Sequence, residues 1–371
     1  MVAIPSTILA IKNTAPKYLK GVTDQTVRNR FFLKYLEQEG RILYNEAAPQ
    51  HIWLVRAREP EVSTAGAGTP VVFQTSDTHE QLSITHARMR ATNAIELETY
   101  KINKSPLQIA NLTETLMKDL VDTLSRKMNS ALYQDNTSDT SLITGIRSIM
   151  QPHGSTTASD LVAVPGTSAA YGGKLLRLGA LGGRWSSTKA SAARMSSVAA
   201  NDWPEGNGDP QYDYLAPKMF QYTGAWQTGT NTWKTNGERI LRKSRVTMRA
   251  LAGATMSPTL HLLAPDMYTD FLEGLVSRER LRISDYATSL GFPDTMEFEG
   301  AMLREDYDCP AGRGYGINPK EMALYTLDDQ LFYIDGPEWS IHAQAFVMLA
   351  GFMGNLRWNP KHFSEYASYV S

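Results

Sequence analysis

Residues 105–134, SPLQIANLTETLMKDLVDTLSRKMNSALYQ, carry the most regular pattern in this chain of 371 residues. Apolar side chains recur there at every fourth position, which places on one face of an α-helix the residues Leu112, Leu116, Leu120, Leu124 and Met128. Ser105 before Pro106 is a typical helix start. At 1.5 Å per residue, a helix from Pro106 to Gln134 would be about 40 Å long. Ordinary helices are much shorter, so we expect a structural strut.

A long β-hairpin is expected before this helix. Residues 52–59 and 71–90 both have the pattern of extended segments, and the second alternates through Leu82, Ile84, His86, Arg88 and Arg90. Residues 63–69, STAGAGT, lie between them and predict a flexible tip. A hairpin with so little apolar surface is marginal alone, so it should lie across another surface.

The arginines of this hairpin are candidates for contact with neighbouring chains. If the tip centres near Ala67, Arg56 lies about opposite Asp77, and this pair would stiffen the loop. Arg58, Arg88 and Arg90 then remain for neighbours.

Residues 1–50 have the composition of an arm rather than of a core. Short apolar runs alternate there with Pro, Lys and Asn, and one helix is expected at residues 24–38. Seven basic residues against four acidic ones give this segment a charge of +3.

Charge is segregated in the second half of the chain. A helix is expected from Thr235, which starts a capping-box pattern with Glu238, to about Gly253. On one face it carries three basic residues, Arg242, Arg245 and Arg249, which could bind phosphate or a neighbour's carboxylates. Residues 294–308 have six acidic residues and one arginine. Such segregation suits head-to-tail association of identical chains, although many monomers share it.

The remaining pattern alternates strands with turns and predicts an α+β fold. Strands are expected at residues 260–263, 296–303, 322–326, 331–334 and 341–356, with a helix at 265–277. Residues 158–233 have only scattered periodicity and give no assignable elements.

No catalytic, cofactor or metal motif is complete. Gly173-Lys174 lacks the Ser or Thr of a phosphate loop, and residues 312–316 predict a turn rather than a dinucleotide site. The seven histidines are dispersed, and neither HExxH nor GxSxG occurs. Glu297 and Glu299 would share a strand face as a candidate acid–base pair, but a solvated or subunit-contacting face is favoured. Cys309 follows acidic residues that oppose a thiolate, so it is expected to be inert.

Composition excludes several classes of protein. A net charge of −1 and 42% hydrophobic residues argue against a strongly basic nucleic-acid binder and against disorder. One cysteine cannot form an intrachain disulfide or a usual structural zinc site. The longest apolar stretch, residues 345–354, is too short to span a bilayer, and the first residues lack a signal-peptide pattern. We therefore expect a cytosolic chain when it is made.

The order of these features resembles the major capsid proteins of tailed bacteriophages, the Hong Kong 97-type fold. The likeness rests on an arm, a long hairpin, a long helix, a mixed domain and returning strands, in that order. The short segments that resemble the family are 142–146 after the helix and 298–300, 308–312, 317–319, 322–326 and 358–360 near the end.

The resemblance implies a division of the chain. It assigns residues 1–50 to an N-arm, 51–100 to an extended E-loop, 101–145 to the P-domain spine helix, 146–295 to an A-domain, and 296–371 to strands completing the P- and A-domains. Some relatives join subunits through a lysine on the E-loop. No lysine occurs here between Lys34 and Lys101, so that covalent link is not expected.

The implied function is a non-enzymatic structural one. Hexamers and pentamers of this chain would form the icosahedral shell of a virion, assembled in the host cytoplasm around double-stranded DNA. Expected partners are other copies, neighbouring capsomers, a portal, scaffolding or decoration proteins where these exist, and packaged DNA contacted without sequence specificity. No cofactor, metal or membrane partner is expected. Candidate inter-subunit residues are Arg56, Arg58, Arg88, Arg90, Arg242, Arg245 and Arg249.

Two alternatives remain from the sequence. An encapsulin-like nanocompartment shell would share this fold and enclose a cargo protein instead of DNA. An enzyme of unrecognised type would use a cleft within residues 158–295, and it would be a compact monomer.

Overall fold

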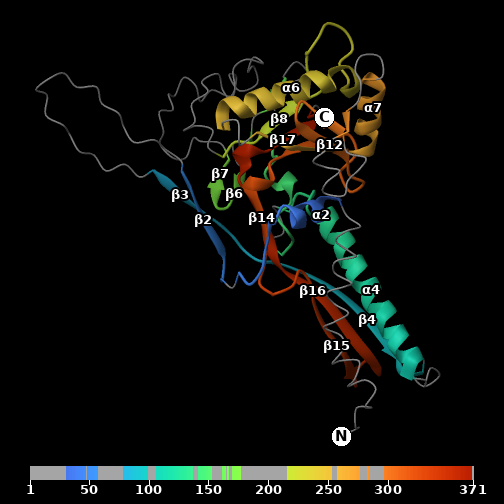
Figure 1. The fold of residues 1–371 in the computed structure, drawn as a ribbon. Helices are drawn as coiled ribbons and strands as arrows, with labels where there is room; N and C mark the ends of the chain where they lie inside the picture. The colour runs from blue at the N-terminus through green and yellow to red at the C-terminus, as the bar shows by residue number, and fades with distance from the viewer. Residues whose placement is uncertain are drawn as a thin grey trace, which may run out of the picture. The chain divides into compact units, whose positions relative to one another are not determined.

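The computed structural model describes residues 31–46, 48–56, 78–98, 106–136, 141–152, 161–163, 165–166, 169–176, 215–252, 257–275, 282–283 and 296–369. The chain divides into two compact units, whose elements are labelled in Figure 1. Unit 1 comprises residues 1–49, 85–146 and 322–357. Unit 2 comprises residues 50–84, 147–321 and 358–371.

Unit 1 is built on a five-stranded sheet. The strands are β1 (Ile42–Leu43), β14 (Met322–Thr326), β16 (Ala345–Trp358) and β15 (Tyr333–Ser340), in that order, with β4 (Ala87–Glu96) also paired to β16. The helix α4 (Pro106–Ala131) packs along β4, and α2 (Phe31–Gln38) lies near its end (Figure 1). Ring contact between Phe32 and Tyr133, 5.5 Å apart, fixes α2 to the segment that follows α4.

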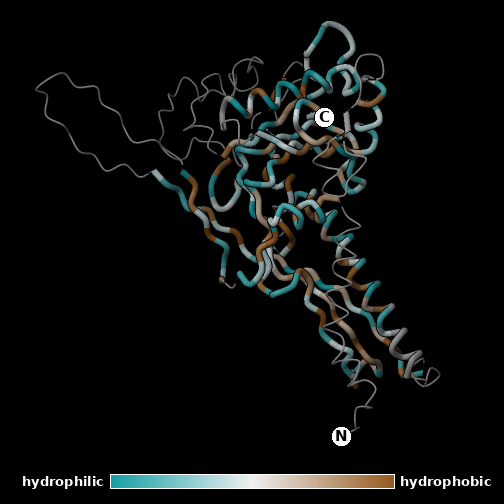
Figure 2. The backbone as a smooth tube through the Cα atoms, viewed as in Figure 1, coloured by the Kyte–Doolittle hydropathy of each residue, from teal (hydrophilic) through white to brown (hydrophobic). Residues whose placement is uncertain are grey.

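The apolar stripe of α4 faces the core as its spacing predicts. Among its described side chains, Met117, Leu120, Leu124 and Met128 are buried, and Figure 2 shows hydrophobic and hydrophilic positions alternating along its turns. The helix ends at Ala131 rather than at Gln134.

Part of the expected arm belongs to the core of unit 1. In α2, the side chains of Phe32, Leu33 and Leu36 are fully buried, and β1 pairs with β14 in parallel. The composition of residues 1–50 does not reveal this, because the apolar cluster at 32–36 is short. The part of the predicted helix before Phe31 lies outside the described residues.

The strand predicted at residues 71–90 is two strands in different sheets. β3 (His79–Ile84) pairs with β2 (His51–Arg56), whereas β4 pairs with β16 through Arg90 opposite Gly351 and Arg88 opposite Met353. The alternation of burial changes phase between them, since Ile84 and Ala87 are both buried. Arg88 and Arg90 are therefore not on the hairpin, contrary to the sequence prediction.

The side chain of Asn355 is hydrogen-bonded to the segment that connects β3 to β4. Its amide group donates to the Thr85 carbonyl, and its side-chain oxygen accepts the Thr144 backbone N–H, both at 2.8 Å. The nearby His86 ring lies edge-on to Tyr325, 5.6 Å away. These contacts come from distant parts of the sequence, so local alternation does not predict them.

Unit 2 is built on an eight-stranded sheet. Its order is β10 (Arg282–Ile283), β11 (Met296–Phe298), β12 (Ala301–Glu305), β9 (Leu260–Leu263), β13 (Gly314–Ile317), β17 (Ser364–Ala367), β8 (Lys218–Gln221) and β5 (Val162–Ala163). The helix α6 (Trp233–Ala252) packs on β8, and α7 (Pro265–Leu275) packs on β9 and β12 (Figure 1). Their shared core includes Trp233, Ile240, Phe271, Phe298 and Tyr366.

Short elements complete the two units. The hairpin β2–β3 and a second hairpin of β6 (Ala170–Tyr171) and β7 (Lys174–Leu175) belong to unit 2. Single 3-10 turns are η1 (Ile146–Ser148), η3 (Pro319–Glu321) and η4 (Pro360–His362).

Several predicted boundaries of unit 2 are wrong. The capping residues of α6 lie earlier than the Thr235–Glu238 pattern suggests, since the Thr232 N–H donates to Thr235 Oγ1 (3.0 Å) and the helix begins at Trp233. The strand expected at 296–303 is a hairpin, because Glu299 and Gly300 turn with positive φ angles of 50° and 78°. Glu297 and Glu299 therefore do not share a strand face.

Two strands of unit 1 are also shifted from their predicted positions. The strands expected at 331–334 and 341–356 are β15 at Tyr333–Ser340 and β16 at Ala345–Trp358.

Candidate interaction surfaces

Among the residues that the structure describes, one face of the hairpin β2–β3 rests on β6–β7. Ser83 N–H donates to the Gly172 carbonyl at 3.2 Å, and Lys174 Nζ lies 2.8 Å from Glu80 Oε2. A Cβ at Gly172, where φ is +58°, would meet Leu82 at 2.8 Å, so only glycine fits this approach. This face of the hairpin is thus covered within the chain.

The opposite face of the hairpin carries exposed apolar side chains. Ile52 and Leu54 alternate along β2 and are 53% and 67% exposed. Arg56 follows on the same face, exposed, and its register partner is His79 rather than Asp77. Asp77 and Arg58 lie outside the described residues. The hairpin therefore presents an apolar pair with an adjacent positive charge.

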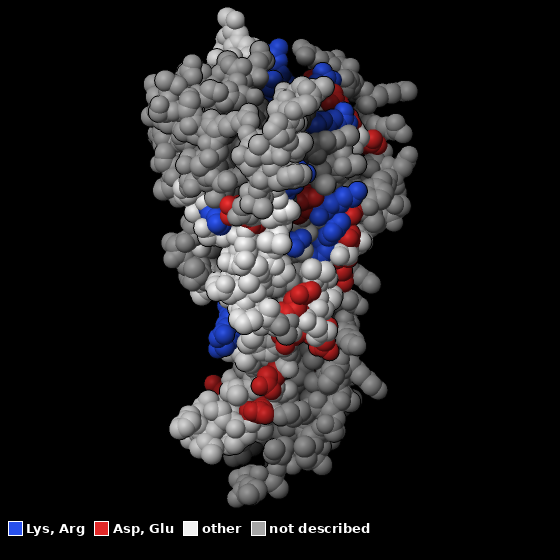
Figure 3. All heavy atoms as spheres, turned by 90° about the vertical axis from the view of Figure 1, so that its left-hand side faces the viewer, with Lys and Arg blue, Asp and Glu red and all other residues white. Residues whose placement is uncertain are grey.

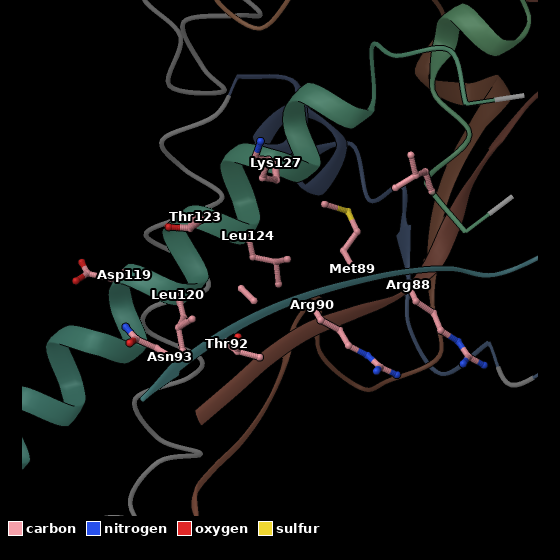
Figure 4. A pocket seen from close by; sticks show the side chains of 12 residues that line it. Arg88, Met89, Arg90, Thr92, Asn93, Asp119, Leu120, Thr123, Leu124 and Lys127 are labelled. Atoms are coloured by element: carbon pink, nitrogen blue, oxygen red, sulfur yellow. The ribbon is translucent and has the colours of Figure 1, made fainter. Parts of the chain in front are cut away.

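Arg88 and Arg90 lie on the face of β4 that points away from α4 (Figure 4). Burial alternates along the strand, so that Arg88, Arg90 and Thr92 are exposed while Ala87 and Ile95 are buried. They remain candidates for contact with a neighbour, but in unit 1 rather than on the hairpin.

The basic face of α6 meets the acidic turn of its own chain. Arg242 Nη2 lies 2.7 Å from Glu238 Oε1, and Arg242 Nε donates to Glu299 Oε1 at 2.6 Å. The same guanidinium lies 5.9 Å from the centre of the Phe298 ring. The complementary charges seen in the sequence are thus partly used within one chain. On the face that Figure 3 displays, basic and acidic side chains are mixed in the upper part of the view and acidic ones predominate below.

The three arginines on the basic face of α6, Arg242, Arg245 and Arg249, have different environments. Arg245 is half-buried beneath the β11–β12 turn, and burial, followed by the nearby positive charge of Arg249, lowers the pKa of its guanidinium. Arg249 is exposed. Of these three arginines, Arg249 is therefore the one that could contact another chain without a change in its surroundings within its own chain.

A buried polar cluster lies between α6 and the sheet of unit 2, and the sequence analysis missed it. Tyr366 OH is hydrogen-bonded to Ser244 Oγ and Ser364 Oγ at 3.0 Å and to His261 Nδ1 at 2.9 Å. Burial, together with the charge of Arg245, lowers the pKa of His261 to about 3. All four side chains are at most 1% exposed, so this Ser–His–Tyr set stabilises the core and cannot reach a substrate.

A second buried cluster surrounds Glu365. Its two carboxylate oxygens accept from Arg313 Nη1 and from the Tyr369 hydroxyl, each at 2.7 Å. Cys309 lies beside it, and burial, with the charges of Asp306 and Glu365, raises the pKa of the thiol well above its usual value. The predicted inert character of Cys309 agrees with this environment.

The described residues hold no group of three or more His, Cys, Asp or Glu side chains placed to bind a metal ion. Among the same residues, no helix has the length and apolarity needed to cross a membrane.

Comparison with solved structures gives the family of the fold. No family model matches the chain, and no curated protein does. The structure titled "Cyanophage A-1(L) capsid asymmetric unit" matches with a TM-score of 0.57 and 14% identity, covering 90% of this chain and 91% of that one. The "Capsid of native GTA particle computed with C5 symmetry" matches with a TM-score of 0.50 and 8% identity, covering 91% and 90%. The chain therefore has the Hong Kong 97-type fold of tailed-phage major capsid proteins.

Proposed function

We propose that this chain is the structural subunit of an icosahedral capsid shell that encloses double-stranded DNA. The observation that carries the proposal is the fold, which matches a cyanophage capsid chain over nine-tenths of both lengths. An agreement that spans both units argues for the whole architecture of a shell subunit rather than for one shared motif.

The exposed face of the hairpin supports a role in self-association. The side chains of Ile52 and Leu54 are exposed to water. Covering them with another surface would stabilise the association by roughly 25 cal/mol per Å² of apolar area buried. Repeated in every copy, such a contact forms a heterologous interface, which gives a ring when the rotation between copies closes and an open filament when it does not. Hexamers and pentamers are the rings that the proposal requires.

The parts of the fold would take the following roles. Unit 1, with α4 as spine, would be the P-domain, and the large sheet of unit 2 would be the A-domain. The hairpin β2–β3 would be the base of an E-loop that ends near Ile84, not at residue 100. Arg56, Arg88, Arg90 and Arg249 are the arginines most suited to contact neighbouring copies.

The shell would belong to a virion assembled in the host cytoplasm. A portal and scaffolding or decoration proteins would be its other partners. The net charge of −1 fits a shell that surrounds DNA without reading its sequence, since a tight DNA binder needs many phosphate contacts. The role is structural rather than enzymatic.

Sedimentation followed by nuclease treatment tests this function. Particles purified from producing cells should sediment far faster than a 41.2 kDa chain and should hold DNA that nuclease does not degrade. Particles filled with a cargo protein instead of DNA would support a nanocompartment shell and contradict the virion role. A slowly sedimenting monomer would contradict both kinds of shell.

A further inference from the structure

Tyr307 is exposed to water at one end of the sheet of unit 2. It is 84% exposed, in the loop that follows β12. The neighbouring Asp306 and Cys309 are buried, and the Cys309 N–H donates to the Asp306 carbonyl at 3.1 Å. The Asp308 N–H donates to Asp306 Oδ1 at 3.0 Å. The loop therefore holds this aromatic side chain in one position, which lowers the entropy that a contact with another surface would cost.

The residues around Tyr307 are acidic. Residues 305–308 have the sequence Glu-Asp-Tyr-Asp, with three carboxylates and no basic residue, and Arg304 lies before them, inside β12. Glu305 and Asp308 are half-buried. The loop thus combines one large exposed aromatic side chain with negative charge.

A surface of complementary character lies on α6. Val246 is 61% exposed although it is apolar, and the exposed Arg242 and Arg249 lie four residues before it and three residues after it. This spacing places the three side chains on one face of the helix. Arg242 is engaged by Glu238 and Glu299 of its own chain. Val246 and Arg249 are therefore the part of this face that best suits a contact.

The two surfaces lie at opposite ends of β12. The turn before β12 is fixed to the middle of α6, because Arg242 Nε donates to Glu299 Oε1 at 2.6 Å. The loop after β12 is fixed to the start of α7, because the Gly312 N–H donates to Asp266 Oδ2 at 3.0 Å. The five residues of β12 span about 17 Å between these two points. The loop therefore does not reach the part of α6 that carries Val246 in its own chain.

We propose that Tyr307 of one copy docks on Val246 and Arg249 of the next copy. The aromatic side chain would cover the Val246 methyl groups and lie against the Arg249 guanidinium, which an aromatic face attracts. Glu305 and Asp308 would face the same basic helix, so the charges of the two surfaces are complementary. A contact between unlike surfaces of identical chains runs head to tail, and it gives a ring when the rotation between copies closes.

This contact deepens the proposed function and rests on it, because a shell places identical copies side by side. Tyrosine and arginine are among the residues that most often dominate the energy of an interface. The contact uses a loop and a helix rather than the exposed face of β2, so variants of the two surfaces can be examined separately.

A charge-exchange cycle in the full chain tests the contact. Tyr307→Arg places a positive charge against Arg249, and Arg249→Glu places a negative charge against the acidic loop, so each variant should weaken association at least ~10-fold. The double variant restores an attractive pair and should recover most of the loss, because residues in contact do not act additively. Tyr307→Phe is the matched control and should associate as the unaltered chain does. Sedimentation velocity over a range of concentrations measures every variant, and circular dichroism checks the fold.

Cysteine pairs test the same contact where the unaltered chain associates too weakly for sedimentation. Tyr307→Cys chains mixed with Val246→Cys chains and oxidised by air should form disulfide-linked pairs that contain one chain of each kind. Either variant alone should form few, because the contact joins unlike surfaces. Cys309 is buried, so it does not compete. Absence of the mixed pair would overturn the proposal, as would a charge-exchange double variant that associates no better than its worse single variant.

The outcomes separate this contact from the shell function. DNA-filled particles together with absence of the mixed disulfide would overturn the contact and leave the shell function intact. Mixed disulfides from a chain that forms no particle would support the contact and contradict the shell function.

Discussion

At the scale of single residues, Gly145 determines how the chain leaves α4. A Cβ at this position would overlap the backbone carbonyl oxygens of Ala131 and Gln134. The Ile146 N–H, which follows directly, donates to the Leu132 carbonyl at 2.8 Å. The chain therefore crosses the end of the helix in close backbone contact, and only glycine allows this approach.

Gly145→Ala should lower the free energy of unfolding by about 1–3 kcal/mol, because the backbone must shift to admit the methyl group. Gly166→Ala is the matched control, since its Cβ would lie 3.5 Å from the nearest atom, the Pro152 carbonyl oxygen, at ordinary contact distance. Urea unfolding of the full chain measures both. Equal midpoints for the two variants would refute this account of the helix end.

His261 should make the stability of the subunit depend on pH. Its pKa is about 3 in the folded chain against about 6.5 when unfolded, so the unfolded state binds the proton more readily. Stability is unaffected above pH 6.5 and falls as pH decreases from 6.5 toward 3. By pH 4.5, the loss from this group should be about 2–3 kcal/mol.

Comparing two histidine variants isolates that contribution. His261→Gln should reduce the loss of stability between pH 7 and pH 4.5, whereas His342→Gln, at an exposed position, should leave it unchanged. Urea midpoints followed by tryptophan fluorescence give the comparison. An unchanged pH profile in His261→Gln would show that the buried histidine is not the titrating group.

The environment of a side chain could be predicted from the sequence only where residues adjacent in the sequence determine it. The sequence indicated that acidic neighbours of Cys309 oppose a thiolate, and the structure adds burial as the larger cause of its raised pKa. The cluster of Ser244, His261 and Tyr366 was not predictable, because its members lie on a helix and two strands far apart in the sequence. Arg242 was expected to face a neighbour, but the turn at Glu299 brings a carboxylate to it within the chain.

At the scale of elements, we expect the association of subunits to be most sensitive to substitutions on the exposed face of β2. Ile52→Asp with Leu54→Asp places two charges on side chains that are at least half exposed, so the subunit should remain folded. Burying those charges between copies would be costly, so assembly should be lost. Circular dichroism checks the fold, and sedimentation checks the assembly.

Ile52→Val with Leu54→Ile is the matched control, since it keeps both side chains apolar and should still assemble. Normal particles from the Asp variant would exclude this face from the interface.

Helices and strands were predicted correctly where one apolar pattern continues without interruption, and wrongly where the pattern changes. The 26-residue α4 and the buried strands β9 and β14 follow directly from their apolar patterns. The alternation of residue types at 82–90 continues across the break at Thr85 and His86. It therefore gave no sign that β4 pairs with β16, in a different sheet from β3. At Glu299, a non-glycine residue with φ of 50° made a turn that strand propensity did not indicate.

At the scale of the whole molecule, the order of elements carried more information than any motif. An arm, a hairpin, a long helix, a mixed domain and returning strands led to the Hong Kong 97-type fold, and the structure has it. The sequence analysis assigned residues 296–371 to strands of both domains without dividing them. In the structure, β14, β15 and β16 belong to unit 1 and β17 belongs to unit 2. This exchange makes each unit depend on the carboxy-terminal residues.

Cryo-electron microscopy of the product that the purified chain forms tests the central claim most directly. The account predicts a closed icosahedral shell with rings of five and six copies, in which each subunit density contains α4 beside the sheet of β4 and β16. Neither an open aggregate nor a lasting 41.2 kDa monomer is compatible with it. Either result, from a chain that is folded by circular dichroism, would contradict the assignment as a shell subunit.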